Sequence, residues 1–525
     1  MSARANLLSF LRDSRSGVAA QDAGDRLRVE MVPLAVADMT ATLVRDHDCE
    51  FASLVVEETD AKDGFKLRYF FYVPDDAILI EIETQAAAGV SLPAISDRVH
   101  AADWHEREAE DLFGIHFAGH PFLGDFVLHD TVWPEAVAPM RHRFDARKRV
   151  AEPGLGAEWQ PRRVLQEEGA LMLPVGPIWG DYHEAGLWLL ETPGEQIRLA
   201  HSRLFYKYRA VEKIAEGQTP VQALLLAERF SGNSAFAHAF AYCQALEKIA
   251  GCVVPLRAQA LRRVFAELER LRYHAASIAE LAGSTALSVG KAMGQEVEER
   301  WLRLAGEVCG HRYLFGMCVP VGLAWEPGET LLARLRAGVK DISKASAELE
   351  RMLIYSSGFL DRIEEMGTLT PELAELYGVV GPVARGSGRS LDLRRSLPYG
   401  GYDAWPMQVP HEIEGDGYAR LRVFFAEIRA STALIEVQLA DLPAGPIASD
   451  CPPQAGAALA WAEAPAGGCF HWLRLDQNGR VARWRIATPG FRNWHAFHRA
   501  VEGAAFQDFP IILASFGLSV AENDR

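Results

Sequence analysis

Paired cysteines are missing from this chain of 525 residues. No two of its cysteines form a C-x-x-C pair, so the sequence offers no recognisable zinc or iron–sulfur site. An odd number of cysteines without a secretion signal favours reduced thiols, each expected to behave as a small buried apolar side chain. The seven cysteines are Cys49, Cys243, Cys252, Cys309, Cys318, Cys451 and Cys469.

Positive charge and long apolar runs are also scarce. The chain has 54 Lys and Arg against 70 Asp and Glu, a net charge of −16, which argues against binding to nucleic acid or anionic lipid. No apolar run approaches the roughly 18 to 20 residues needed to span a bilayer. The first residues, "MSARANLLSFLRDSRSG", lack the apolar core of a secretion signal. We therefore expect a cytoplasmic protein without a membrane span.

Residues 26–100 predict a mixture of helices and strands. The runs "EFASLVVEET" and "KLRYFFYVPDDAILIEIETQ" are rich in β-branched and aromatic residues, with a turn at residues 74–76. Periodicity is lost over the basic, proline-bearing stretch 141–163, which is typical of a linker. We expect an α+β domain over residues 1–150, a linker over 151–170 and a second domain over 171–525.

The second domain is predicted to be mainly helical with a small β component. Two short strand-like runs between residues 174 and 200 are followed by long helical text. Residues 329–366 and 417–442 are each expected to form one long amphipathic helix. Near the end of the chain, "CFHWLRLDQNGRVARWRIATP" predicts a hairpin that turns at Asn478-Gly479. Further signals are helix starts at Thr219-Pro220 and Thr370-Pro371, a helix end at Gly251, and an apolar stripe of Leu261, Val264, Leu268, Leu271 and Ile278.

Segment 104–121, "WHEREAEDLFGIHFAGHP", combines four carboxylates with three histidines. His116 and His120 have the i, i+4 spacing of a helical metal-binding pair. Gly119 and Pro121 oppose an uninterrupted helix at that point, so we favour an acidic helix facing solvent or a partner over a metal site.

Segment 176–186, "GPIWGDYHEAG", is predicted to be a loop between two strands. Asp181, Tyr182, His183 and Glu184 are polar residues of the kind that line binding pockets. A plain hairpin loop is the alternative.

Segment 228–238, "ERFSGNSAFAH", places four poor helix formers between two helical runs. Two residues separate Ser231 from Ser234, and His238 follows Ser234 by one helical turn. A serine nucleophile with a histidine base is disfavoured here, because the strained G-x-S-x-G turn and an acidic partner are both missing. A simple turn is the other reading.

Segment 381–405, "GPVARGSGRSLDLRRSLPYGGYDAW", is rich in glycine and arginine but has no G-x-G-x-x-G pattern. Arg385 is therefore expected to pair with carboxylates or to stack on a planar ligand, and not to bind a nucleotide phosphate.

Taken in order, these segments resemble two related families. "WHEREAEDLFGIHFAGHP" looks like the signature of the 30 kDa-type subunit of respiratory complex I, and the chain from "LPVGPIWGDYHEAG" onward resembles the 49 kDa-type subunit. The chain is equally similar to large subunits of group 4, energy-converting [NiFe] hydrogenases of the formate hydrogenlyase type. The resemblance covers nearly the whole chain and implies a [NiFe] hydrogenase large-subunit-like second domain. It is carried by "FYKYRAVEKIAEGQTPVQALLLAERFSGNSAFAHAFAYCQALEKIAG", "ELERLRYH", "GPVARGSG", "GYARLRVFFAEIRAS", "EAPAGGCFHWLR" and "FPIILASFGLSVAENDR".

In the hydrogenases that this chain resembles, a C-x-x-C pair after "ER" and a second pair near the C-terminus bind nickel and iron. The resemblance aligns the first pair with Ser231 and Ser234, and "SFGLSVAENDR" contains no cysteine. Ala466 replaces an arginine that typically follows the "EAP" motif. Because a serine hydroxyl does not replace a bridging thiolate, no working [NiFe] centre and no other bound metal are expected in this chain.

In the 49 kDa-type family, a histidine on the first loop and a tyrosine at the matching helix start are implicated at the quinone headgroup. The resemblance aligns the histidine with His183, while Gly232 stands at the position of the tyrosine; Tyr182 is a possible substitute. The expected site is a pocket at Ser231, Gly232, Ser234 and His238 for a quinone or similar acceptor, with His183 donating a proton. Asp181 and Arg385 are its other expected residues.

The resemblance implies a subunit of a membrane-associated oxidoreductase on the inner face of the cell membrane. Its expected partners are a small iron–sulfur protein with a [4Fe–4S] cluster, similar to the B-type small subunit of complex I, a ferredoxin-like protein and antiporter-like membrane proteins. This chain is expected to hold no cofactor itself. A scaffold without catalytic function is the main alternative, and an isolated metalloenzyme has little support.

Overall fold

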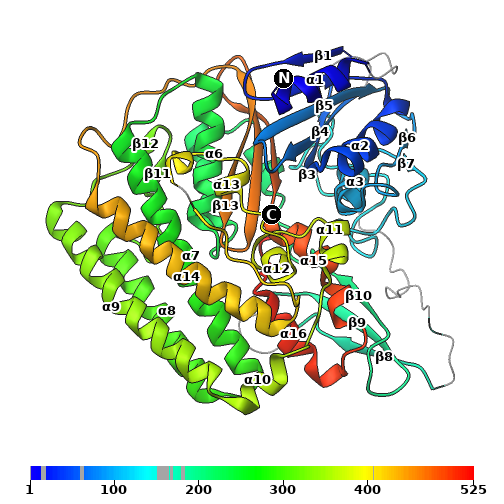
Figure 1. Cartoon of the computed structure of the whole chain (residues 1–525). Coiled ribbons are helices and arrows are strands. Elements are labelled where there is room, and N and C mark those ends of the chain that lie inside the picture. Colours follow the sequence, from blue (N-terminus) through cyan, green and yellow to red (C-terminus); the bar gives the residue numbers. More distant parts are fainter. Residues whose placement is uncertain are drawn as a thin grey trace.

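The computed structural model describes residues 2–13, 19–59, 64–150, 165, 169–178, 184–405 and 407–525. Within them, helices and strands form an N-terminal α+β part and a large helical part, with small sheets beside and between them (Figure 1). The C-terminal end of the chain lies near the centre of the molecule. Most of the predicted linker falls outside the described residues, so its bounds remain predictions.

The N-terminal part contains a five-stranded sheet in the order β1-β2-β5-β4-β3. The predicted strands form the antiparallel pairs β3–β4 and β4–β5. The predicted turn after Val73 joins β4 to β5. These elements are α1 (Ala3–Asp13), β1 (Ala19–Asp22), β2 (Leu27–Glu30), α2 (Pro33–His47), β3 (Glu50–Glu58), β4 (Phe65–Val73), β5 (Ile78–Ala86), β6 (Leu92–Pro93), η1 (His100–Ala102), α3 (Asp103–Phe113) and β7 (Phe117–Ala118).

Four long helices make the helical bundle: α7 (Leu256–Ser284), α8 (Ser288–Cys309), α9 (Glu329–Ile354) and α14 (Gly417–Ala440). The predicted apolar stripe of α7 is buried throughout. The single helix predicted over 329–366 is wrong, because α9 ends at Ile354 and α10 (Ser357–Ile363) is separate. The chain leaves the helical conformation at Tyr355 and Ser356, which follow the last turn of α9.

Shorter elements connect the bundle to the rest of the molecule. The predicted helix starts are confirmed, since the hydroxyls of Thr219 and Thr370 accept backbone N–H groups, and Gly251 ends α6 with a left-handed conformation. The elements are β8 (Leu171–Val175), β9 (Leu187–Thr192), β10 (Leu199–Arg203), α4 (Val211–Ala215), α5 (Pro220–Arg229), α6 (Ala235–Ala250), β11 (Cys318–Val319), β12 (Gly322–Leu323), α11 (Pro371–Leu376), α12 (Gly381–Gly386), α13 (Leu393–Ser396), η2 (Tyr402–Ala404), α15 (Pro489–Val501), η3 (Phe506–Asp508) and α16 (Phe509–Phe516).

A three-stranded sheet lies between the two parts. It contains β13 (Gly456–Ala464), β14 (Gly467–Leu475) and β15 (Val481–Ala487), and the predicted hairpin is the β14–β15 pair. From β15, Arg483 donates to the Val56 carbonyl and Arg485 to the Leu54 carbonyl of β3, each at 3.1 Å. The N-terminal sheet is thereby joined to the helical part through buried hydrogen bonds.

One expectation about the cysteines is wrong. Cys252 and Cys451 form a disulfide between the end of α6 and the segment before β13, with their Cα atoms 6.1 Å apart. Sequence spacing gave no sign of this pair, because 199 residues separate the two cysteines and only the tertiary fold brings them together. The other five cysteines are free and buried.

The acidic helix α3 is not solvated, contrary to expectation. Glu106 accepts the N–H of Ile95 at 2.8 Å, and Glu108 binds Arg485 at 2.5 Å and Arg525 at 2.7 Å. These carboxylates are buried because their partners come from segments that the helix packs against. His116 and His120 do not form a helical pair, as expected from Gly119 and Pro121, since α3 ends at Phe113. His116 contacts Ser91, and His120 contacts Asp103.

Candidate functional site

The serine-containing segment is the turn between α5 and α6. Ser231 and Ser234 are 2% and 0% exposed, and neither hydroxyl has a hydrogen-bond partner among the described residues. Ser234 is the N-cap residue of α6, yet its side chain does not cap the helix. Two buried hydroxyls are thus left with unused hydrogen-bonding capacity, which is uncommon in a folded interior.

Glu269 of α7 caps α6 instead. Its carboxylate accepts the N–H groups of Phe236 at 2.6 Å and Ala237 at 2.9 Å. Burial raises the pKa of Glu269 to about 7, although the two N–H donors oppose this shift. Arg272, one turn further along α7, donates to the carbonyl of Asn233 at 2.9 Å. The "ELERLRYH" segment therefore sets the shape of the turn. The sequence analysis used this segment only as part of the family resemblance and did not predict its contacts with the turn.

Gly232 stands between the two buried serines but is itself exposed. A Cβ atom added to it would meet no described atom within 4 Å. The turn therefore has open space at the position that the resemblance assigns to a tyrosine.

His238 belongs to a buried chain of hydrogen bonds. Its Nδ1 lies 3.0 Å from Nε2 of His471, and its Nε2 lies 3.3 Å from Oε1 of Glu522. Trp484 donates from Nε1 to Nδ1 of His471 at 3.3 Å. Because an indole nitrogen only donates, we assign the proton of His471 to Nε2 and that of His238 to Nε2. His238 then donates to the Glu522 carboxylate, and neither serine hydroxyl is bonded to it, so no serine–histidine nucleophile pair forms.

His238, Cys469 and His471 bring three potential metal ligands within 4.8 Å of one another. In the tautomer assigned above, Nε2 of His471 carries a proton and donates it to Nδ1 of His238, so neither of these nitrogens has a free lone pair for a metal. Burial also raises the pKa of Cys469 well above its usual value, which favours the thiol over the thiolate. Together with two serine hydroxyls at the turn, this donor set does not fit a nickel–iron centre.

Residues 517–525 are packed against the turn and its surroundings. Glu522 accepts the N–H of Gly490 at 2.9 Å, and Arg525 reaches Glu108 of α3. Tyr273 of α7 donates to the carbonyl of Gly517. The side chain of Asn523 is fully buried, and neither of its polar atoms has a partner in the part of the chain that the structure describes. These residues bring α3, α7 and α15 to one place.

The predicted loop joins the antiparallel strands β8 and β9, as expected. Asp181, Tyr182 and His183 lie outside the described residues. Glu184, the next residue, forms an ion pair with Lys207 at 2.8 Å. Glu184 also acts electrostatically on the carboxyl of Asp524, whose pKa burial raises to about 7. The described end of the loop therefore lies near residues 517–525.

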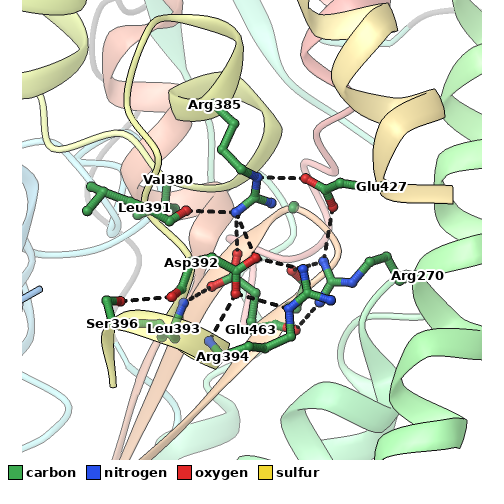
Figure 2. Close-up of polar contacts among 12 residues, drawn as sticks. Arg270, Val380, Arg385, Leu391, Asp392, Leu393, Arg394, Ser396, Glu427 and Glu463 are labelled. Atoms are coloured by element: carbon green, nitrogen blue, oxygen red, sulfur yellow. Dashed lines mark hydrogen bonds and ion pairs between the residues drawn. The ribbon is translucent and has the colours of Figure 1, made fainter. Parts of the chain in front are cut away.

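Arg385 is completely buried and bound to carboxylates (Figure 2). Its Nε donates to Glu427 at 2.6 Å, and its Nη1 donates to Glu463 at 3.0 Å and to Asp392 at 3.4 Å. The alternative in which Arg385 stacks on a planar ligand is wrong, because its side chain lies inside an ionic network. Among the described residues, its side chain donates only to these carboxylates and to the Leu391 carbonyl, which leaves it apart from the serine-containing turn.

A cavity of about 850 Å³ lies elsewhere, between the N-terminal part on one side and α11 with Gly378, Arg389 and Leu391 on the other. Its lining includes Glu50 and Arg389, which form an ion pair across the two parts of the chain. The cavity is distinct from the predicted acceptor pocket.

Two sequence families match the chain. Residues 30–150 match the family described as "Respiratory-chain NADH dehydrogenase, 30 Kd subunit", and residues 289–454 and 450–525 match "Respiratory-chain NADH dehydrogenase, 49 Kd subunit". The serine-containing turn lies between these matched segments.

Three relatives are similar to most of the chain. Formate hydrogenlyase subunit 5 of Escherichia coli is 30% identical over 439 residues, which are 82% of this chain and 77% of the relative. Hydrogenase-4 component G of Escherichia coli is 30% identical over 507 residues, 95% and 87% of the two chains. The C/D subunit of the NADH-quinone oxidoreductase of Bdellovibrio bacteriovorus is 28% identical over 505 residues, 88% of each.

The chain matches two complex I families one after the other, and its relatives are oxidoreductase subunits. These findings define it as a respiratory oxidoreductase subunit. The chain belongs to the family of fused 30 kDa and 49 kDa respiratory-chain NADH dehydrogenase subunits and related hydrogenase subunits. This confirms the predicted resemblance. Within the described residues, no helix is both long and apolar enough to cross a membrane.

Proposed function

We propose that this subunit receives electrons from a partner's [4Fe–4S] cluster and passes them to a quinone or a similar small acceptor at the Ser231–Ser234 turn. The observation that carries the proposal is the pair of buried serine hydroxyls that lack partners among the described residues. A hydroxyl donates readily to a carbonyl oxygen, which is the polar group of a quinone. Open space at Gly232 gives such an acceptor a place beside them.

Reduction of a quinone to a quinol consumes two electrons and two protons. The electrons come from the partner's cluster. We assign one proton to His183, with Asp181 and Tyr182 on the same loop, because imidazole exchanges protons near neutral pH, and the second proton to solvent water reaching the exposed turn at Gly232. The ion pair of Glu184 with Lys207, close to Asp524, supports a loop held beside residues 517–525.

The proposal includes no nickel–iron centre, although the second domain is proposed to share the hydrogenase large-subunit fold. The hydroxyls of Ser231 and Ser234 and the protonated groups around His238 do not provide thiolates. Metal analysis of the purified chain is expected to find nickel far below one equivalent. Stoichiometric nickel would overturn this part of the proposal.

The proposed complex is membrane-associated and lies on the cytoplasmic side. Its other members would be a small iron–sulfur protein, a ferredoxin-like protein and antiporter-like membrane proteins, by analogy with the complexes named for the relatives. Genes for such proteins are expected beside the gene for this chain.

The test is electron transfer in the intact complex. Ser231→Ala with Ser234→Ala removes two hydrogen bonds to the acceptor, each contributing roughly 0.5–1.5 kcal/mol, so KM for the acceptor is expected to rise about 5-fold to 150-fold. His183→Ala is expected to lower kcat at least 10-fold. Ser387→Ala is the matched control, because Ser387 is equally buried and its hydroxyl also lacks a partner among the described residues.

A second candidate function is a scaffold that joins other proteins of the complex without catalysis. The missing thiolates and the glycine at position 232 favour it. Unchanged electron transfer in an assembled complex carrying both the serine and the His183 substitutions would support the scaffold and contradict the acceptor site.

A further inference from the structure

A second group of buried charges has its own network of hydrogen bonds and ion pairs (Figure 2). Among the residues that the structure describes, its hydrogen bonds and ion pairs join three guanidinium groups to four carboxylates. The guanidinium groups belong to Arg270, Arg385 and Arg394, and the carboxylates to Glu267, Asp392, Glu427 and Glu463. Each of these seven residues is at most 3% exposed.

The charges in this network do not balance. Three arginines remain protonated at any physiological pH, while four ionised carboxylates would leave one negative charge in excess. Desolvation makes such a charge costly in the interior, and a buried carboxylate commonly becomes neutral by binding a proton. His274 donates to Glu427 at 2.8 Å, and burial lowers the pKa of its imidazole, which favours the neutral form.

The contacts show which carboxylate has the least compensation. Both oxygens of Glu267 accept from Arg394 at 2.9 Å, and the hydroxyls of Tyr402 and Ser431 also donate to it. Glu427 accepts from Arg385 at 2.6 Å and from His274 at 2.8 Å.

Asp392 is also well compensated, since Arg394 binds it at 2.6 Å and 3.0 Å. Glu463 accepts only from Nη1 of Arg385, at 3.0 Å, and from the N–H of Leu393, also at 3.0 Å, among the described residues. Asp392 approaches the same Nη1 atom at 3.4 Å. Two carboxylates therefore converge on one guanidinium nitrogen, and Glu427 takes another hydrogen bond from the same guanidinium, so the single positive charge of Arg385 is divided among three carboxylates. Where like-charged carboxylates share a site, one of them tends to bind a proton.

We propose that Glu463 binds a proton near neutral pH, held beside Asp392 at Nη1 of Arg385, so that this chain contains an internal proton-binding site. The step is Glu463–COO⁻ + H⁺ → Glu463–COOH, and it involves no electron and no other bond. It removes the excess negative charge from the network. The proposal does not rest on the acceptor site.

The groups around Glu463 agree with this assignment. Burial, followed by the charge of Asp392, raises the pKa of Glu463 to about 7, whereas arginines lower the pKa values of Asp392 and Glu427. The titratable and charged groups that interact with it are Arg270 on α7, Arg385 on α12, Asp392 at α13, Tyr399 before η2, Cys469 on β14 and Tyr72 on β4. His274 on α7 binds Glu427 on α14, and Arg394 binds Asp392, so these three act on Glu463 through its neighbours.

The pH dependence of thermal unfolding of the full chain tests the proposal. A carboxyl with a raised pKa binds more protons in the folded state, so its contribution to stability falls as pH rises from about 4.5 towards and beyond 7. Glu463→Gln removes this loss. The difference in Tm between variant and wild type is expected to increase by about 3 °C from pH 5.5 to pH 8.5.

The control is Glu247→Gln, which removes one carboxylate from the buried Arg262 ion pair outside the network. It is expected to lower Tm at both pH values. A difference between Glu463→Gln and wild type that stays constant with pH would overturn the proposal. So would a Glu463→Gln chain that fails to fold at pH 5.5, because a neutral amide should replace a group that is already neutral there.

Infrared spectroscopy gives an independent measurement. The spectrum of the wild type minus that of Glu463→Gln is expected to show a protonated carboxyl band at pH 6 that is lost at pH 8.5. Asp392→Asn should also lack the band, because removing Asp392 removes the excess charge and leaves Glu463 ionised. A wild-type spectrum without this band would contradict the proposal.

Discussion

His238 and Glu522 are 284 positions apart in the chain and share a buried hydrogen bond of 3.3 Å. The contact joins α6 to the segment 517–525 near the C-terminal end of the chain. Through Trp484 and His471, the same chain of hydrogen bonds fixes the tautomer of His238. His238 therefore holds this segment in place and does not act on Ser234.

The first prediction concerns that hydrogen bond. Glu522→Ala leaves the His238 Nε2–H and the Gly490 N–H buried without their acceptor. Each unsatisfied donor costs about 1–3 kcal/mol, so the free energy of unfolding should fall by roughly 2–6 kcal/mol. Urea unfolding measures the change. Glu522→Gln keeps one acceptor oxygen and should lose clearly less; equal losses would show that the hydrogen bonds are not the cause.

The second prediction concerns Glu269 at the start of α6. Its pKa is raised by burial to about 7, so the folded state binds the proton more tightly than the unfolded chain does. The stability from this group is present at low pH and is lost as pH rises from about 4.5 through 7. A shift of this size corresponds to about 3 kcal/mol. Glu269→Gln should remove that part of the decline in a series of denaturant titrations from pH 5 to pH 8.5.

The exposed Glu372 provides the control for this series, because Glu372→Gln changes a solvated carboxylate whose pKa is lowered. The Glu372→Gln and wild-type curves should stay nearly parallel over the same pH range. If the stability of Glu269→Gln also changed with pH in parallel with the wild type, the raised pKa of Glu269 would be contradicted.

The third prediction uses the space at Gly232. Because no described atom lies within 4 Å of its Cβ position, Gly232→Tyr should fold with a Tm within about 2 °C of the wild type. In the intact complex, the added phenol should lower KM for a quinone analogue if the turn is the acceptor site. A crystal structure or Tm measurement checks the first point, and steady-state kinetics checks the second.

Gly490→Ala is the matched substitution without such space. Its Cβ would lie 2.7 Å from Oε2 of Glu522 and 2.9 Å from Oδ1 of Asn523. The resulting clash should cost about 1–3 kcal/mol in urea unfolding. A Gly490→Ala chain as stable as Gly232→Ala would contradict the packing described for residues 517–525.

The fourth prediction concerns the disulfide. Thiol titration of the denatured chain should find five free thiols before reduction and seven after it. Reduction of Cys252–Cys451 should lower the free energy of unfolding by about 2–4 kcal/mol. Cys451→Ser, measured with and without reductant, checks that the effect comes from this bond, since the variant should no longer respond.

Much of the local structure followed from sequence patterns. Thr219 and Thr370 cap helices as predicted, and Asn478-Gly479 turns the predicted hairpin, because caps and turns depend on residues close together in the chain. The break between α9 and α10 was missed, since amphipathic periodicity continues across Tyr355 and Ser356. The acidic helix α3 was misjudged, because burial of Glu106 and Glu108 depends on partners far away in sequence.

The sequence by itself determined the family and the order of its two family matches along the chain. Residue identity and short-range spacing are sufficient for those conclusions. Only the tertiary structure decided that Glu269 caps α6, that Glu522 binds His238, and that Arg385 lies among carboxylates. Those contacts join segments up to hundreds of residues apart. Their energies depend on burial, which local sequence patterns do not specify.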